Sequence, residues 1–233
     1  MPRKCNTKAV PVIAAIGASI TEGAGANDML TESYPAQLQG LLGSKYTVFN
    51  FGKSGRTVRR GLPSYDSDPL PWIENRQWTE TKAAVPDVAI INMGTNDSRT
   101  THVPATTVEN FKQAYEYLLD ELLKVNPDMR IIVCTVPYTW ENNLDISNDN
   151  IRNIIAPVIR GIAKERGLEL VDLFEITENK SRLFCDGVHL TTRGYEMLAK
   201  VFEKVILVGA KDALTAEFLA EIDEGYSDKS APK

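Results

Sequence analysis

The sequence predicts an α/β fold in which helices cover both faces of a five-stranded parallel sheet. Five short apolar runs alternate along the chain with segments of helical periodicity, which is the order expected for parallel strands joined by helical crossovers. The 233 residues are 43% hydrophobic and 24% charged, with no change of composition along the chain. These values favour one domain over residues 1–233.

The expected strands are apolar on both faces, as strands between two helical layers must be. They lie at residues 10–16, 46–51, 88–93, 131–136 and 168–173.

Helices are predicted where apolar residues recur every three or four positions. They cover residues 34–42, 111–122, 151–166 and 192–206, and the last has Thr191 or Thr192 as its N-cap. The catalytic core is expected over about 10–208. Residues 209–233 are acidic and weakly patterned, so we expect a peripheral extension with one helix and a frayed end.

Two long loops, 56–77 and 138–150, follow strands at the sheet edge where α/β proteins bind ligands. They are the expected walls of a substrate site. Trp72 and Trp140 are candidates to stack on a sugar ring, and Arg56 is a candidate to bind a substrate oxygen. The alternatives are that the tryptophans anchor the loops and that Arg56 meets only solvent.

Ser19 follows the first strand directly and begins a short helical segment. At such a position the helix dipole and free N–H groups favour negative charge, which suits a nucleophile. The segment Ser19 to Glu22 also fits a capping box, in which Ser19 is an ordinary helix cap.

Asp186 and His189 are three residues apart, so one helical turn would place both side chains on the same face. The carboxylate would then orient the imidazole that acts as the base for Ser19. The alternative is an Asp-Gly turn beside a structural histidine. Asp172 is a rival for the carboxylate role. His102 has no carboxylate at comparable spacing, and we expect it at the surface.

Gly55 and Asn96 each follow a different expected strand. Each lies in an ordinary turn composition when taken alone. On one parallel sheet, however, the N–H of Gly55 and the amide of Asn96 would converge with the N–H of Ser19 on one carbonyl oxygen. This arrangement predicts an oxyanion hole.

Four stretches in this order resemble the sequence blocks of the SGNH hydrolases, also called the GDSL esterase/lipase family. They are Gly17-Ala18-Ser19, Asn50-Phe51-Gly52-Lys53-Ser54-Gly55, Gly94-Thr95-Asn96-Asp97 and Asp186-Gly187-Val188-His189. Ala18 departs from the aspartate usual in the first block, which removes a supporting polar contact but no proposed catalytic atom. The resemblance runs from about residue 13 to about 202.

The resemblance implies a flavodoxin-like three-layer α/β/α sandwich with Ser19 as nucleophile, Asp186 and His189 as its partners, and no metal or cofactor. It places the oxyanion glycine at Gly55, with Gly52 as the less favoured register, and the side-chain donor at Asn96. The chain looks most like the branch that removes acetyl groups from carbohydrates. We therefore expect a serine esterase for short acyl esters, with carbohydrate O-acetyl groups favoured. A lysophospholipase or thioesterase of the same family and a non-catalytic sugar-binding module are the alternatives.

Composition narrows the range of partners. The net charge is −5 and the only basic cluster is Arg56, Arg59 and Arg60, which argues against nucleic acid. No apolar run reaches the roughly 20 residues that span a bilayer.

Three widely spaced cysteines indicate neither a disulfide framework nor a zinc site. The basic N-terminus lacks a following apolar stretch, so we expect a cytoplasmic chain unless a signal peptide has been removed. The oligomeric state stays open.

Overall fold

The computed structural model describes residues 10–62, 70–102 and 105–228. Its centre is a five-stranded sheet in the order β2-β1-β3-β4-β5, and every pair of neighbours is parallel. The strands are β1 (Val12–Gly17), β2 (Thr47–Gly52), β3 (Val88–Asn92), β4 (Arg130–Cys134) and β5 (Glu169–Val171). All five predicted strands are confirmed, each with boundaries shifted by a few residues. The strand order is that of flavodoxin-like folds.

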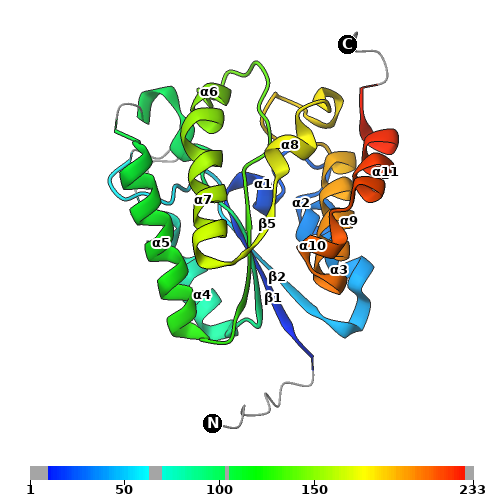
Figure 1. The fold of residues 1–233 in the computed structure, drawn as a ribbon, viewed down its shortest axis with the longest axis horizontal. Helices are drawn as coiled ribbons and strands as arrows, with labels where there is room; N and C mark the ends of the chain where they lie inside the picture. The colour runs from blue at the N-terminus through cyan, green and yellow to red at the C-terminus, as the bar shows by residue number, and fades with distance from the viewer. Residues whose placement is uncertain (1–9, 63–69, 103–104, 229–233) are drawn as a thin grey trace.

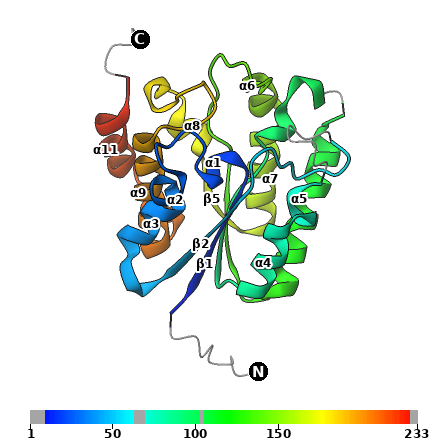
Figure 2. The same cartoon turned by 180° about the vertical axis from the view of Figure 1, so that it is seen from behind.

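Helices cover both faces of this sheet (Figures 1 and 2). One layer holds α4 (Arg76–Ala84), α5 (Val108–Val125) and α7 (Ala156–Arg166), and α7 is preceded by α6 (Asn148–Asn150) and a π-helical turn over Ile151–Ile155. The other holds α3 (Tyr34–Leu42), α9 (Thr192–Val208), α10 (Ala210–Ala213) and α11 (Ala216–Tyr226). Short helices α1 (Ser19–Glu22), α2 (Met29–Glu32) and α8 (Leu173–Thr177) complete the fold. Within the described ranges, no helix is long and apolar enough to cross a membrane.

Alternate residues of each strand supply the two cores. In β1, Ala14 and Ile16 pack beneath α5 and α7, whereas Ile13 and Ala15 pack with α3 and α9. Successive side chains of a strand point to opposite faces, so a strand that is buried on both sides reads as a continuous apolar run. These continuous apolar runs are the pattern that predicted the sheet.

The register of the central strands brings three chain segments to the same edge of the sheet. Gly17 at the end of β1 pairs with Gly52 of β2 and with Asn92 of β3. A Cβ atom at Gly17 would lie 1.9 Å from the Thr21 hydroxyl oxygen and 2.8 Å from the Asn92 carbonyl oxygen. Only glycine therefore permits this close approach between β1, β3 and the helix that follows.

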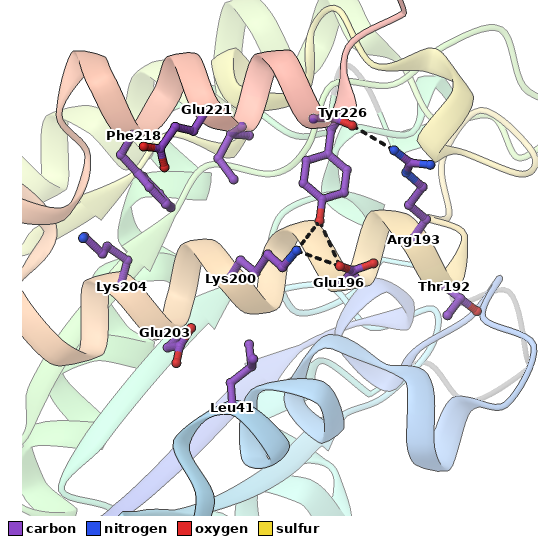
Figure 3. Close-up of a pocket in the computed structure, with 12 residues that line it drawn as sticks. Leu41, Thr192, Arg193, Glu196, Lys200, Glu203, Lys204, Phe218, Glu221 and Tyr226 are labelled. Atoms are coloured by element: carbon purple, nitrogen blue, oxygen red, sulfur yellow. Dashed lines mark hydrogen bonds and ion pairs between the residues drawn. The ribbon is translucent and has the colours of Figure 1, made fainter.

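The C-terminal helices belong to the same packed unit. Ala213 and Ile222 are buried with the core on the α9 side, and the buried Lys180 ammonium pairs with Asp223 at 2.5 Å. Between α9 and α11 lies a hollow of about 910 Å³. In this hollow Lys200 bonds to both Glu196 and the Tyr226 hydroxyl, as Figure 3 shows.

A buried carboxylate anchors the loop that follows β2. Asp97 is fully buried, and its two oxygens accept the N–H groups of Val58 at 3.0 Å and Arg59 at 3.1 Å. Burial raises the pKa of Asp97 to about 6, although these hydrogen bonds act in the opposite direction. The segment that carries Asn96 and the loop after Gly55 are therefore tied together.

We expect Asp97→Asn to change how stability depends on pH. The folded state holds the Asp97 proton up to about pH 6, whereas the unfolded chain releases it near 3.8, so this carboxyl makes the protein less stable as pH rises through that range. Asparagine does not ionise. The free energy of unfolding of the variant, minus that of the wild type, should rise by on the order of 2–3 kcal/mol between about pH 4 and pH 7 in urea titrations. A difference that is independent of pH would contradict this expectation.

Candidate active site

Ser19 is the first residue of α1, and its hydroxyl faces a histidine rather than the helix. The N-cap is Ala18, and no side chain caps the helix. The Ser19 Oγ atom lies 2.8 Å from Nε2 of His189, and the side chain is almost buried at 8% exposure. The sequence left two roles open for Ser19, nucleophile or helix cap. The geometry gives Ser19 the contact with a base that a nucleophile needs, and Ser19 does not cap the helix.

Asp186 and His189 meet through a tight loop and not through a helical turn. The loop is closed by an antiparallel bridge between Phe184 and Leu190. Asp186 Oδ1 accepts the N–H groups of Val188 at 3.0 Å and His189 at 2.7 Å, while Oδ2 lies 2.7 Å from His189 Nδ1. The expected contact is present, but the expected helical turn is wrong, because an aspartate side chain that caps its own turn produces the same approach.

This geometry assigns the protons of the imidazole. A carboxylate only accepts hydrogen bonds, so Nδ1 carries the hydrogen and Nε2 of the neutral ring is free to accept one from Ser19. Burial alone would raise the pKa of Asp186, but the hydrogen bonds from His189 and Val188 outweigh it and leave that pKa below its ordinary value. Asp186 is thus held as a carboxylate beside the ring.

The loop over 138–150 supports the loop that carries His189. The backbone N–H of Trp140 donates to the Gly187 carbonyl at 2.8 Å. Gly187 has φ +84, and a Cβ atom there would lie 2.3 Å from the Glu141 carbonyl oxygen. Only glycine allows the two loops this close. The Trp140 ring packs on Tyr138, with centroids 4.8 Å apart.

The segments after β2 and β3 place Gly55 and Asn96 at the same cavity as Ser19. Asn96 uses one amide hydrogen to bond the Arg56 carbonyl at 3.0 Å, which leaves its second hydrogen for another acceptor. Gly52, the other register, instead packs on the backbone of α1, where a Cβ atom would lie 2.1 Å from the Glu22 nitrogen. The cavity therefore favours Gly55 as the oxyanion glycine.

The cavity has a volume of about 230 Å³. It is small beside the roughly 300–1,000 Å³ of pockets for drug-sized ligands. Beyond the predicted residues, its lining includes an apolar group from Leu144, Ile146 and Val188, and the cation Arg99. Leu144 and Ile146 come from the loop 138–150 that was expected to form a wall. Arg99 had no signal in the sequence, although it lies three residues beyond Asn96. The complete lining is Ser19, Ala24, Ser54, Gly55, Thr95, Asn96, Arg99, Leu144, Ile146, Val188 and His189.

The three candidate substrate-binding residues lie outside this cavity lining. Arg56 and Trp72 are 0% and 1% exposed, so neither side chain is accessible to a substrate. This burial contradicts the expectation that the two residues bind one. Arg56 donates to the Leu70 carbonyl, and the Trp72 indole donates to the Phe51 carbonyl at 2.8 Å. Trp140 is half-buried and contacts the His189 loop through its backbone. Among the described residues of 56–77, none lines the cavity.

Two other sequence candidates also have clear positions. Asp172 accepts both Arg160 Nε at 2.6 Å and the Thr135 hydroxyl at 2.9 Å, so Asp186 and not Asp172 is the carboxylate at His189. The expectation that His102 lies at the surface is wrong. His102 is buried, and its Nδ1 lies 2.8 Å from the Asn96 carbonyl oxygen, a contact that steadies the segment carrying the Asn96 amide.

Solved structures with this fold include several esterases. A carbohydrate acetylesterase family member from Sinorhizobium meliloti superposes with a TM-score of 0.69 at 20% identity, covering 87% of this chain and 100% of that one. The acetyl xylan esterase AlAXEase gives 0.63 at 22% identity, covering 84% and 99%. At these identities the likeness concerns the fold.

Curated relatives are similar in sequence. An acetylxylan esterase of Xylanibacter ruminicola is 29% identical over 218 residues, which are 83% of this chain and 42% of that protein. The cellulase/esterase CelE of Acetivibrio thermocellus is 34% identical over 102 residues, which are 40% of this chain and 12% of that protein. The chain thus spans less than half the length of these relatives.

The model of one protein family matches residues 15–197, the range from β1 into α9 that contains every residue of the Ser19–His189–Asp186 arrangement. The chain belongs to the GDSL-like lipase/acylhydrolase family.

Proposed function

We propose that the chain is a serine esterase that removes short acyl groups, above all O-acetyl groups, from carbohydrates. The observation that carries the proposal is the hydrogen-bonded series from Ser19 through His189 to Asp186 at the edge of a cavity of about 230 Å³. Binding of a sugar without catalysis does not require a serine hydroxyl held 2.8 Å from an oriented imidazole, whereas nucleophilic catalysis does. The similarity to an acetylxylan esterase supports the carbohydrate substrate.

In the proposed reaction, Ser19 Oγ attacks the ester carbonyl while His189 Nε2 takes its proton. Asp186 accepts the Nδ1 hydrogen and stabilises the imidazolium that forms. The bond between the carbonyl carbon and the sugar oxygen then breaks as His189 gives its proton to that oxygen, so that the sugar leaves as an alcohol and the acyl group stays on Ser19. Water repeats the attack with His189 again as base, and this second step releases the free acid.

The oxyanion of each tetrahedral intermediate needs donors that are already in place. The proposed donors are the N–H groups of Ser19 and Gly55 and the second amide hydrogen of Asn96. Asn96 supports this role because the Arg56 carbonyl and the buried His102 hold its side chain and backbone. No reorganisation is then required when the charge forms.

Short acyl groups are favoured because Leu144, Ile146 and Val188 form the apolar part of this small cavity. Such a wall accommodates a methyl or ethyl group. A lysophospholipase or a thioesterase for long acyl chains requires a continuous apolar channel, and each methylene buried in it would add about 0.8 kcal/mol.

Ser19→Ala and His189→Ala should each abolish nearly all hydrolysis of p-nitrophenyl acetate, because the members of such a triad act as a unit. The double variant should be scarcely worse than either single variant. Circular dichroism and thermal unfolding check that the fold is intact. Turnover near the wild-type value in folded Ser19→Ala would sink the assignment of the nucleophile.

Asn96→Ala should lower kcat by roughly 10²–10³, with little change in KM, because the donor acts on charge that exists only in the transition state. Steady-state kinetics on p-nitrophenyl acetate measure both constants, and thermal unfolding reports the loss of the bond to Arg56. An increase in KM at constant kcat would instead assign Asn96 to substrate binding.

Acetyl and propionyl esters should have higher kcat/KM than octanoyl esters, measured below micellar concentrations, and acetylated xylan should release acetate. Leu144→Ala should raise kcat/KM for butanoyl relative to acetyl esters about fourfold per methylene newly accommodated. A rise toward octanoate in the wild type, without acetate release from xylan, would favour the lipid or thioester enzyme.

A further inference from the structure

Glu22 joins the helix of the nucleophile to the turn that carries Gly55. It is the last residue of α1, whose first residue is Ser19. Its Oε2 atom accepts the backbone N–H of Ser54 at 2.8 Å and also the Ser54 hydroxyl. One carboxylate therefore accepts both hydrogen-bond donors of the residue next to Gly55. The capping-box pattern does not explain this contact, because the carboxylate bonds to a different segment of the chain.

The turn over residues 53–56 determines where the Gly55 N–H points. It is closed by the Arg56 N–H, which donates to the Lys53 carbonyl at 3.3 Å. Gly55 has φ +76, and Ser54 is not among the residues with positive φ, so the turn is of type II. In a type I turn the peptide between Ser54 and Gly55 is rotated by roughly 150–170° relative to type II. That peptide carries the Gly55 N–H.

The flanks of this turn are held by other contacts. On one side, the Lys53 N–H donates to the Gly17 carbonyl at 3.0 Å, and the Gly52 N–H donates to the Asn50 side chain at 2.8 Å. On the other side, Asp97 holds the backbone of Val58 and Arg59. Ser54 lies between these anchors, and its N–H and hydroxyl both donate to Glu22.

We propose that Glu22 is a positioning residue for the oxyanion hole. By holding the N–H and the hydroxyl of Ser54, it fixes the residue before Gly55 and thereby favours the type II turn, in which the Gly55 N–H meets the carbonyl oxygen attacked by Ser19. This inference rests on the proposed function. A carboxylate this close to the hole also repels a developing oxyanion, so its benefit is geometric and not electrostatic. A neutral side chain of the same shape should therefore replace it, and a shorter charged side chain should not.

The test compares Glu22→Gln, Glu22→Asp and Glu22→Ala, with Glu80→Ala as the control. Glu80 is a surface residue of α4 that pairs with Arg76. We measure kcat and KM for p-nitrophenyl acetate, thermal unfolding, and inhibition by phenylboronic acid, which forms a tetrahedral adduct with a nucleophilic serine.

Glu22→Ala should lower kcat 10- to 100-fold, leave KM within about twofold, and weaken boronic acid binding by a factor similar to the loss in kcat. Glu22→Gln should keep kcat within about threefold of the wild type, because the amide oxygen accepts the same two hydrogen bonds. Glu22→Asp should be clearly worse than Glu22→Gln despite keeping the charge. Glu80→Ala should change none of these values.

A Glu22→Ala variant with kcat within twofold of the wild type, or with an effect on KM alone, overturns the inference. A Glu22→Gln variant whose kcat is as low as that of Glu22→Asp also overturns the inference. This second comparison is the test if Glu22→Ala does not fold. A wild-type protein that hydrolyses no ester refutes the proposed function itself. An active wild type that loses activity in Ser19→Ala but not in Glu22→Ala refutes only the role of Glu22.

Discussion

The close packing of backbone at Gly17 is the constraint on which the rest of the structure depends. The strand end pairs on one side with Gly52 and on the other with Asn92, and there is no room for a side chain between them and Thr21. A larger residue would separate α1 from the sheet. Because the chain leaves three neighbouring strands at this one point, the proposed nucleophile and the proposed oxyanion donors begin from rigid, adjacent positions.

His189, the proposed base for Ser19, is positioned by a different physical means. His189 lies on an irregular loop, so its place is set by hydrogen bonds within that loop and by its contact with the loop over 138–150. Asp186 serves twice, since one oxygen shapes the turn and the other orients the ring. Glycine recurs where the two loops touch, at Gly187, for the same reason as at Gly17.

The sheet could be predicted, and Ser19, Gly55 and Asn96 could be expected at one edge of it, because they follow strong local rules. Buried strands are continuously apolar, and the binding groups of α/β proteins follow strand ends. The contact between Asp186 and His189 was expected from their spacing alone. The direction of a side chain in a long loop has no such rule. Arg56 and Trp72 have the composition of binding residues, yet they point inward to bond carbonyl groups. His102 was expected at the surface because no carboxylate lies at a suitable spacing from it, whereas it is buried against Asn96. The role of Glu22 was hidden because its spacing from Ser19 also fits a common helix signal.

The two residues that exchange the proton in the proposed reaction are far apart along the chain, since Ser19 and His189 are separated by 170 positions. Ser19 follows the first strand, whereas His189 comes after all five strands. During synthesis Ser19 therefore emerges from the ribosome long before His189, its proposed base. A partly made or partly folded molecule holds an unactivated hydroxyl, so covalent labelling of Ser19 by a serine-directed probe would count only the molecules whose last loop has docked.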